Sequence, residues 1–212
     1  MKITKDTRLY GSLSFKAGNK GCEYFNEMFQ QYKVDAIYRS FSVSNFYDAF
    51  TSMKTLKFSG IGVAMPFKVI ACEYVDRLNL TAEKCGAINT ILFEEDFTVG
   101  FNTDYLAAYR MLGIYNPENR RVHILGTGGL SKAYQAACRD KKIEFVILNR
   151  LTTDSVFNLT NEIVFNCTPL KLDVRNNIYV DCLTDTPTGY EFFLYQAREQ
   201  FKLYTGYEIP IT

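Results

Sequence analysis

Two short segments of the chain, Pro66-Phe67-Lys68 and Asn102-Thr103-Asp104, each place an ionisable side chain beside residues that favour a turn. A lysine and a carboxylate that lie together can take up and return a proton, which is general acid–base chemistry worth roughly 10²- to 10⁴-fold in rate. Taken singly, each residue has a plainer interpretation, because surface lysines and N-cap aspartates are common. The pair therefore predicts a catalytic site if the fold brings Lys68 and Asp104 into contact.

A glycine-rich turn, Gly126-Thr127-Gly128-Gly129-Leu130, separates a β-branched run from an amphipathic segment. A strand, a tight turn and a helix N-terminus expose backbone N–H groups that bind a pyrophosphate. Asn149 and Arg150 end the next predicted strand, at the distance of about twenty residues where an NAD site usually carries an acidic residue. An arginine suits the 2′-phosphate of NADP instead. The alternatives are an ordinary strand-to-helix turn and a solvated loop cation.

The elements that would position these residues alternate between strand and helix, which favours an α/β fold with a parallel sheet. Apolar and β-branched runs predict strands at 8–14, 34–43, 60–65, 88–93, 98–101, 122–125 and 144–148. Helical spacing predicts helices at 22–32, 45–56, 67–78 and 105–112, and one that leads from the glycine turn through Cys138. A domain boundary is expected near residues 103–119, where the pattern begins anew.

Composition excludes several classes of protein. With 212 residues, 47% of them hydrophobic, the chain can bury the core of one or two domains. A net charge of +1 provides no basic surface for nucleic acid, and no apolar run is long enough for a membrane span or a signal core. Six scattered cysteines without a C-x-x-C pair, and a single histidine, predict no metal site. We expect a globular, cytoplasmic protein with reduced thiols.

In their order along the chain, these motifs resemble those of the shikimate dehydrogenase family. The resembling segments are 61–68 for the family's G-x-N-V-T-x-P-x-K, 100–104 for G-x-N-T-D, 149–152 for N-R-T, 163–169 for the strand D-I-V-I-N-A-T-P and 189–196 for G-x-x-M-L-V-x-Q. The resemblance implies a two-domain α/β fold. An abridged, Rossmann-like nucleotide domain at 104–188 would be inserted into an α/β substrate domain formed by 1–103 and 189–212.

The resemblance also implies roles for single residues. Lys68 and Asp104 would exchange the proton at the substrate's reacting oxygen while hydride passes to or from the nicotinamide, and Asn89 and Gln196 would bind the substrate. NADP, with NAD as the alternative cofactor, would be held by Gly126, Thr127, Gly128, Gly129, Leu130, Asn149 and Arg150.

The chain departs from the family where the substrate's carboxylate is held. Family members use two serines, and Asn19 and Gly21 stand at those positions. Ser12 and Ser14 are the alternative ligands, so Ser12, Ser14 and Asn19 are the substrate-binding candidates at this end of the site. Losing two charge-assisted hydrogen bonds would weaken binding of a carboxylate by roughly 10²- to 10⁴-fold. The pattern resembles most the divergent shikimate dehydrogenase-like branch, and shikimate itself is expected to be a poor substrate.

The predicted function is NADP-dependent oxidoreduction between a ring hydroxyl and a ketone on a shikimate- or quinate-like polyol. The expected partner is a small cyclic hydroxy acid, and the protein is expected to be a monomer or a homodimer that binds neither nucleic acid nor membranes. The rival is a catalytically silent ligand-binding or regulatory homologue, favoured by the lost serines and the shortened nucleotide domain. A third hypothesis, a nucleotide sensor without a substrate, would not require Lys68 and Asp104.

Overall fold

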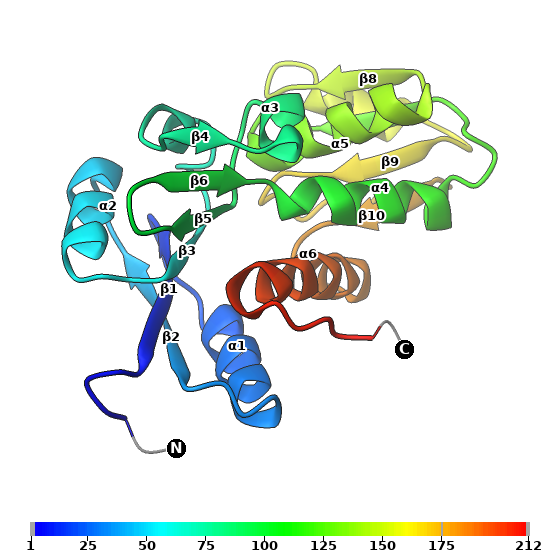
Figure 1. Ribbon diagram of the computed structural model, residues 1–212. Coiled ribbons are helices and arrows are strands. Elements are labelled where there is room, and N and C mark those ends of the chain that lie inside the picture. The colour runs from blue at the N-terminus through cyan, green and yellow to red at the C-terminus, as the bar shows by residue number, and fades with distance from the viewer. Residues whose placement is uncertain (1–2, 175, 211–212) are drawn as a thin grey trace.

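The computed structural model describes residues 3–174 and 176–210, which form two β-sheets with helices around and between them (Figure 1). Sheet A has the strand order β2-β1-β3-β5-β6-β4, and sheet B has the order β10-β9-β7-β8. Strands and helices alternate along most of the chain. The predicted α/β fold class is confirmed.

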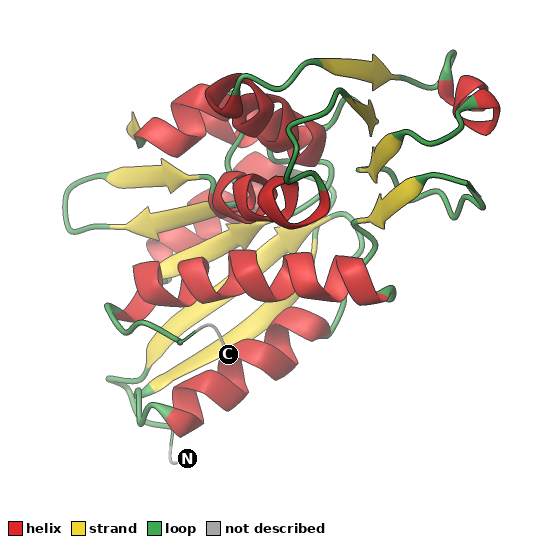
Figure 2. Cartoon of the chain, turned by 90° about the vertical axis from the view of Figure 1, so that its right-hand side faces the viewer, coloured by secondary structure: helices red, strands yellow, loops and turns green. Residues whose placement is uncertain are grey.

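Sheet A is a mixed sheet. Its parallel part consists of β1 (Arg8–Ser14), β2 (Ala36–Ser42) and β3 (Gly60–Val63), and its antiparallel part of β5 (Thr90–Phe93) and β6 (Thr98–Phe101), with the short β4 (Arg77–Leu78) at the edge beside β6. Leu13 packs in the cluster that contains α2 (Phe46–Thr55), whereas Tyr10 packs with α1 (Lys20–Gln31) and α6 (Pro187–Thr205). Because side chains alternate along a strand, both faces of sheet A are covered, and Figure 2 shows helices across one of them.

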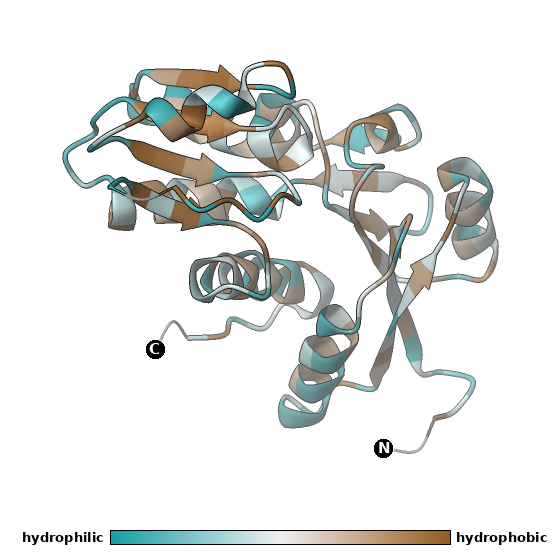
Figure 3. Cartoon of the chain, turned by 180° about the vertical axis from the view of Figure 1, so that it is seen from behind, coloured by the Kyte–Doolittle hydropathy of each residue, from teal (hydrophilic) through white to brown (hydrophobic). Residues whose placement is uncertain are grey.

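Sheet B is parallel throughout and consists of β7 (Val122–Leu125), β8 (Phe145–Leu148), β9 (Ile163–Asn166) and β10 (Ile178–Asp181). One face packs against α4 (Thr103–Tyr115) and α5 (Gly129–Lys141). Among the described residues, those that cover the opposite face belong to the 3₁₀ segment η2 (Thr153–Asn158) and to neighbouring loops. Its strands are largely apolar, as expected for parallel strands, and appear brown in Figure 3.

The predicted helix at 67–78 is wrong. After β3 the chain makes a turn, then a single 3₁₀ segment, η1 (Ile70–Glu73), and then β4. The carbonyl oxygen of Lys68 accepts a hydrogen bond from the N–H of Ile88 at 2.8 Å, so this carbonyl is used by a distant segment instead of by a helix. Lys68 therefore lies in a turn and not at a helix N-terminus.

A short helix, α3 (Leu80–Cys85), was not among the predicted elements. The side chain of Asn79 caps it by accepting from the N–H of Ala82 at 3.1 Å, and Gly86 ends it with a left-handed φ of 57°. An N-cap asparagine followed by a glycine after the last turn is a recognised helix signature, so the sequence carried a usable signal.

The six cysteines are all free thiols. Burial raises the pKa of Cys85 and of Cys138 to about 12, so both remain protonated at neutral pH. Across residues 3–174 and 176–210, no helix has both the length and the apolar character needed to cross a bilayer.

Candidate active site

Lys68 and Asp104 form an ion pair. Their Nζ and Oδ2 atoms lie 2.5 Å apart, and their side chains are 19% and 3% exposed. Asp104 occupies the first turn of α4, where the positive end of the helix dipole favours a carboxylate. The two residues that sequence reasoning singled out are therefore joined by a charge-assisted hydrogen bond that is largely shielded from solvent.

The segments that carry this pair are fixed by the short connection between α3 and β5. Ile88 donates to the carbonyl oxygen of Lys68, as described above. Asn102, which is fully buried, donates its amide N–H to the carbonyl oxygen of Ala87 at 2.7 Å and accepts from the N–H of Tyr105 at 3.1 Å. Asn102 thus starts α4 and ties it to the same connection that holds Lys68.

Asn89 orients Asp104 from the side opposite the lysine. Its Nδ2 lies 3.0 Å from Oδ1 of Asp104 and 2.8 Å from Oγ1 of Thr103, and its Oδ1 accepts from the N–H of Thr103 at 2.8 Å. Gln196 reaches the same group from α6, with Oε1 3.4 Å from Nδ2 of Asn89. These contacts bring together all four residues predicted to surround the reacting group.

Gln200 is a polar residue of this network that sequence reasoning missed. It is 4% exposed, and its Nε2 donates to Oγ1 of Thr90 at 2.7 Å and lies 3.2 Å from the carbonyl oxygen of Asn89. It follows Gln196 by one helical turn and therefore lies on the same face of α6. That spacing was a signal for a second buried glutamine.

A cleft of about 600 Å³ opens beside this network. All the predicted catalytic and substrate-binding residues line it, together with Leu130 from the predicted cofactor set: Ser12, Ser14, Asn19, Lys68, Asn89, Asp104, Leu130 and Gln196. Lys16 and Lys20 also line it and place positive charge near the serines. The lining has the chemistry to receive a small polar anion.

The two serines of β1 differ in availability. Oγ of Ser12 lies 3.0 Å from Oγ of Ser40, so this hydroxyl already has a protein partner. Ser14 is 7% exposed, and within residues 3–174 and 176–210 its hydroxyl has no hydrogen-bond partner. Because Ser14 lines the cleft and its hydroxyl is not committed to a protein partner, it is the better placed of the two to bind a ligand.

Tyr38 fills part of the space beside the two glycines of the cleft. A Cβ added at Gly62 would lie 3.0 Å from the Tyr38 hydroxyl oxygen, and one added at Gly21 would lie 3.3 Å from Cε1 of the ring. Burial raises the pKa of the Tyr38 hydroxyl well above its ordinary value, so it stays neutral. Larger side chains at positions 21 and 62 would therefore have to displace this tyrosine.

The predicted cofactor residues lie at the carboxyl ends of β7 and β8. Gly126 has a φ of 104°, which favours glycine, and its N–H donates to the carbonyl oxygen of Leu148 at 2.8 Å. The turn continues through Thr127 to Gly128, the N-cap of α5. The first N–H groups of a helix lack intrahelical partners, so this turn fits a phosphate group.

Asn149 and Arg150 follow β8 and are exposed. The N–H of Asn149 donates to Oγ1 of Thr152 at 2.9 Å, and the Asn149 side chain accepts from the N–H of Leu151 at 2.9 Å. β7 and β8 are neighbours with Leu125 opposite Leu148, so the turn that carries Arg150 lies next to the glycine turn. The two cofactor segments are brought together at the carboxyl ends of neighbouring strands of sheet B, and Leu130 extends from the glycine turn to the cleft lining.

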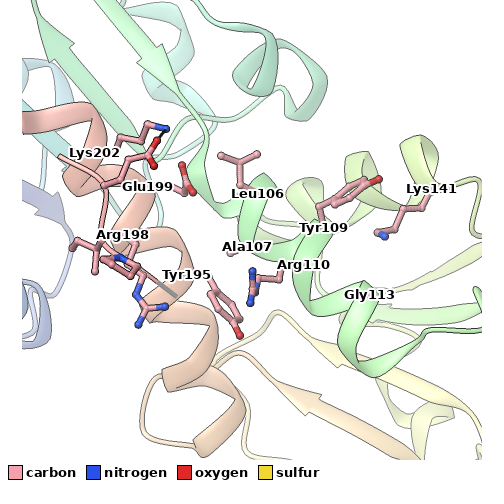
Figure 4. Close-up of a pocket in the computed structure, with 13 residues that line it drawn as sticks. Leu106, Ala107, Tyr109, Arg110, Gly113, Lys141, Tyr195, Arg198, Glu199 and Lys202 are labelled. Carbon is pink, nitrogen blue, oxygen red and sulfur yellow. Dashed lines mark hydrogen bonds and ion pairs between the residues drawn. The ribbon is translucent and has the colours of Figure 1, made fainter. Parts of the chain in front are cut away.

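A larger hollow, of about 840 Å³, lies between other faces of α4 and α6 (Figure 4). Arg110 stacks on the ring of Tyr195 at 4.4 Å, and Lys141 stacks on the ring of Tyr109 at 4.0 Å. The predicted site residues, all of which lie in the described part of the chain, are not among those that line it. We place the candidate site in the smaller cleft, because the acid–base pair lies there.

Residues 20–91 match the family model of the shikimate dehydrogenase substrate binding domain. A shikimate dehydrogenase-like protein of Haemophilus influenzae is 31% identical over 143 residues, covering 67% of this chain and 53% of that protein. A quinate/shikimate dehydrogenase of Escherichia coli is 26% identical over 278 aligned positions, covering 100% of this chain and 96% of that protein. The chain belongs to the shikimate dehydrogenase family.

The family assignment extends to the three-dimensional fold. The solved structure of a shikimate 5-dehydrogenase-like protein superposes on this family member with a TM-score of 0.81 at 25% identity, over 99% of this chain and 95% of the other. The chain spans between 47% and 62% of the length of four of the curated relatives that it matches. Activity, substrate and partners of those relatives are therefore proposals for this shikimate dehydrogenase homologue.

Proposed function

We propose that the protein is an NADP-dependent oxidoreductase that interconverts a ring hydroxyl and a ketone on a shikimate- or quinate-like polyol. The observation that carries the proposal is the Lys68–Asp104 pair, with 2.5 Å between Nζ and Oδ2, on the wall of a cleft that Leu130 of the glycine turn also lines. Relatives named shikimate dehydrogenase (NADP(+)) support the substrate class and the cofactor.

The acid–base pair would handle the proton of this reaction. In the direction of ketone reduction, the Lys68 ammonium donates a proton to the substrate oxygen while that oxygen gains negative charge. In the direction of alcohol oxidation, the pair takes up the hydroxyl proton, with Asp104 as the stabilising carboxylate. Bound NADP would supply the hydride acceptor or donor. Asn89, held between Asp104 and Gln196, would orient the pair, and it would meet a ring hydroxyl of the substrate at the wall of the cleft.

The cofactor would be held at the carboxyl ends of these neighbouring strands of sheet B. The backbone from Gly126 to Leu130 would receive the pyrophosphate, and Arg150 with Asn149 would bind the 2′-phosphate that distinguishes NADP from NAD. The corresponding division of the chain is a nucleotide domain of residues 104–188 and a substrate domain of 1–103 and 189–212.

The substrate's carboxylate would bind at the Ser14 end of the cleft. The free hydroxyl of Ser14 can donate one hydrogen bond, Asn19 a second, and the nearby Lys16 an ionic contact. Ser12 contributes less, because its hydroxyl is already bonded to Ser40. This arrangement differs from a pair of serines and supports a cyclic hydroxy acid other than shikimate as the preferred substrate.

A catalytically silent homologue is the second candidate, and the thin covering of sheet B by η2 and loops favours it, because a weakly packed domain would hold its cofactor poorly. In both cases we propose a cytoplasmic monomer or homodimer.

A screen of cyclic hydroxy acids with NADP⁺ and with NAD⁺ tests the proposal, with absorbance of the reduced nicotinamide as the readout and Lys68→Ala as the matched control. We expect turnover with NADP⁺ on at least one compound, and turnover lower by about 10²-fold or more in the control. Binding of cofactor and hydroxy acid by calorimetry without any turnover would support the silent homologue instead.

A further inference from the structure

The first residue of α5 lies against the aliphatic stem of Lys68. A Cβ atom built on Gly129 would fall 2.6 Å from Cβ of Lys68, 3.0 Å from its Cδ and 3.3 Å from its Cγ. Real Cβ atoms essentially never come within 3.0 Å of another heavy atom, so any side chain at position 129 would force Lys68 or the start of α5 to move. The glycine turn and the acid–base pair are thus in direct contact.

The three glycines of the turn differ in the structural reason for a glycine at their position. Gly126 has a φ of 104°, a backbone conformation that favours glycine. Gly128 has a φ of −77°, and an added Cβ would meet nothing within 4 Å. Gly129 is not among the residues with positive φ, and alanine is the better helix former by about 1 kcal/mol, so neither backbone nor helix propensity explains a glycine there. Among contacts within the described chain, Lys68 explains it.

Lys68 is held at three places along its length. Its carbonyl oxygen accepts from the N–H of Ile88 at 2.8 Å, its stem lies on Gly129, and its ammonium bonds to Asp104 at 2.5 Å. A free lysine side chain has many rotamers, and a general acid is effective only when its donor atom is held near the reacting atom. The contact with Gly129 restricts the middle of the stem, which no hydrogen bond can do.

We propose that Gly129 is a positioning residue for Lys68. Its missing side chain lets the lysine stem lie on the glycine turn, and this contact aligns the ammonium with Asp104 and with the substrate oxygen. The proposal rests on the proposed function only in taking Lys68 as the proton donor. It predicts that the start of α5 sets the geometry of the acid–base pair in addition to receiving a phosphate.

The test compares Gly129→Ala with Gly128→Ala, whose new methyl group has open space, and with Gly113→Ala on the exposed face of α4, where the nearest atom would be Nζ of Lys141 at 3.8 Å. The first readout needs neither substrate nor cofactor. Competitive acetylation with acetic anhydride, read by mass spectrometry, compares Lys68 with the exposed Lys57. In Gly129→Ala we expect Lys68 to react about tenfold faster, because its charge-assisted bond to Asp104 is weakened. Both control variants should match the parent.

The second readout separates binding from turnover with the best substrate from the screen. Gly129→Ala should lower kcat by roughly 10- to 10²-fold, the effect of a misplaced catalytic group, with the cofactor KM nearly unchanged. Gly128→Ala should change mainly the cofactor KM. Unchanged Lys68 acetylation in Gly129→Ala, a raised KM with intact kcat, or loss of its cooperative thermal transition would each overturn the proposal. Absence of turnover in the parent would refute the proposed function, while the acetylation result would still decide the role of Gly129.

Discussion

In the part of the chain that the structure describes, helices cover both faces of sheet A, whereas in sheet B they cover one face and leave the other to a 3₁₀ segment and loops. One face of sheet A packs on α2 through Leu13 and Phe50, and the other packs on α1 and α6 through Tyr10. The second face of sheet B has a small core, contributed by Leu125, Leu148, Val156, Val164 and Val174. The edge strand β8 also leaves Val146 and Ile147 37% and 38% exposed. Sheet B has the less complete core of the two.

The better-covered and the less-covered sheet also carry different parts of the candidate site. Most of the hydrogen bonds that orient Lys68 and Asp104 come from the connection before β5, from α4 and from α6, where burial is high. The groups proposed for the cofactor lie at the edge of sheet B, and Arg150 is exposed. The residues proposed for proton transfer are therefore more firmly held than those proposed for cofactor binding, since buried networks hold side chains better than exposed turns do.

Removing either member of the acid–base pair should have the largest effect. We expect Lys68→Ala, and likewise Asp104→Asn, to lower kcat by about 10²-fold or more, because the proton can no longer be exchanged at the reacting oxygen. Cofactor affinity should stay near that of the parent, because neither side chain belongs to the proposed cofactor segments. Steady-state kinetics and cofactor titration measure the two quantities, with thermal unfolding as the check on the fold. Equal turnover in variant and parent would show that the pair takes no part in the mechanism. The proposed contrast between a firmly held proton-transfer site and a less firmly held cofactor site would then fail as well.

How far the sequence predicts the structure depends on the range of the interactions. The strands β1, β6 and β7 agree with their predicted bounds to the residue, since each is specified by a local run rich in apolar or β-branched residues. The segment at 67–78 fails, because its conformation depends on the bond from Ile88 to the carbonyl of Lys68, between residues far apart in the chain.

For the site, the same distinction holds. The motifs predict the pairing of Lys68 with Asp104, which the structure confirms as a contact. Three features depend on tertiary packing and have no local signature: Tyr38 beside the two glycines of the cleft, the free hydroxyl of Ser14, and the contact of Gly129 with Lys68. Which side chain fills a gap is decided by elements that meet only in the folded chain.

The same truncation in the two sheets should have different costs. Leu13 and Leu125 are both fully buried, Leu13 in the cluster with α2 and Leu125 in the small cluster under η2. Leu→Ala substitutions in cores typically cost about 2–5 kcal/mol, with the higher values where the surroundings cannot relax into the cavity. We expect Leu13→Ala near the upper end and Leu125→Ala near the lower end, measured by urea unfolding. A larger loss for Leu125→Ala would show that sheet B is the more tightly packed region.

Cofactor choice tests the exposed edge of sheet B. NADP should bind more tightly than NAD, and Arg150→Ala should remove most of the difference, about 10- to 10²-fold for one charge-assisted contact to the 2′-phosphate. NAD affinity serves as the internal control and should change little, because NAD lacks that phosphate. Titration of both dinucleotides in parent and variant gives the four constants. If the parent protein binds NADP and NAD equally well, Arg150 is a solvated cation and the turn after β8 does not distinguish the two cofactors.

The smallest effect is expected on the side of sheet A, where Asn19 and Gly21 are proposed to stand in place of the family's two serines. Asn19→Ser should raise kcat/KM for shikimate by up to about tenfold, since one hydroxyl bond to the carboxylate is regained. Adding Gly21→Ser should bring little more, because its Cβ would lie 3.3 Å from the ring of Tyr38 and the ring would have to shift. The parent protein and the Gly21→Ser single variant complete the comparison. If the parent already uses shikimate with a kcat/KM of roughly 10⁴ M⁻¹s⁻¹ or above, an efficiency typical of enzymes on their own substrates, no anchor has been lost. Ser12, Ser14 or Lys16 would then hold the carboxylate. Sheet A would in that case provide a working carboxylate site in addition to a well-packed core.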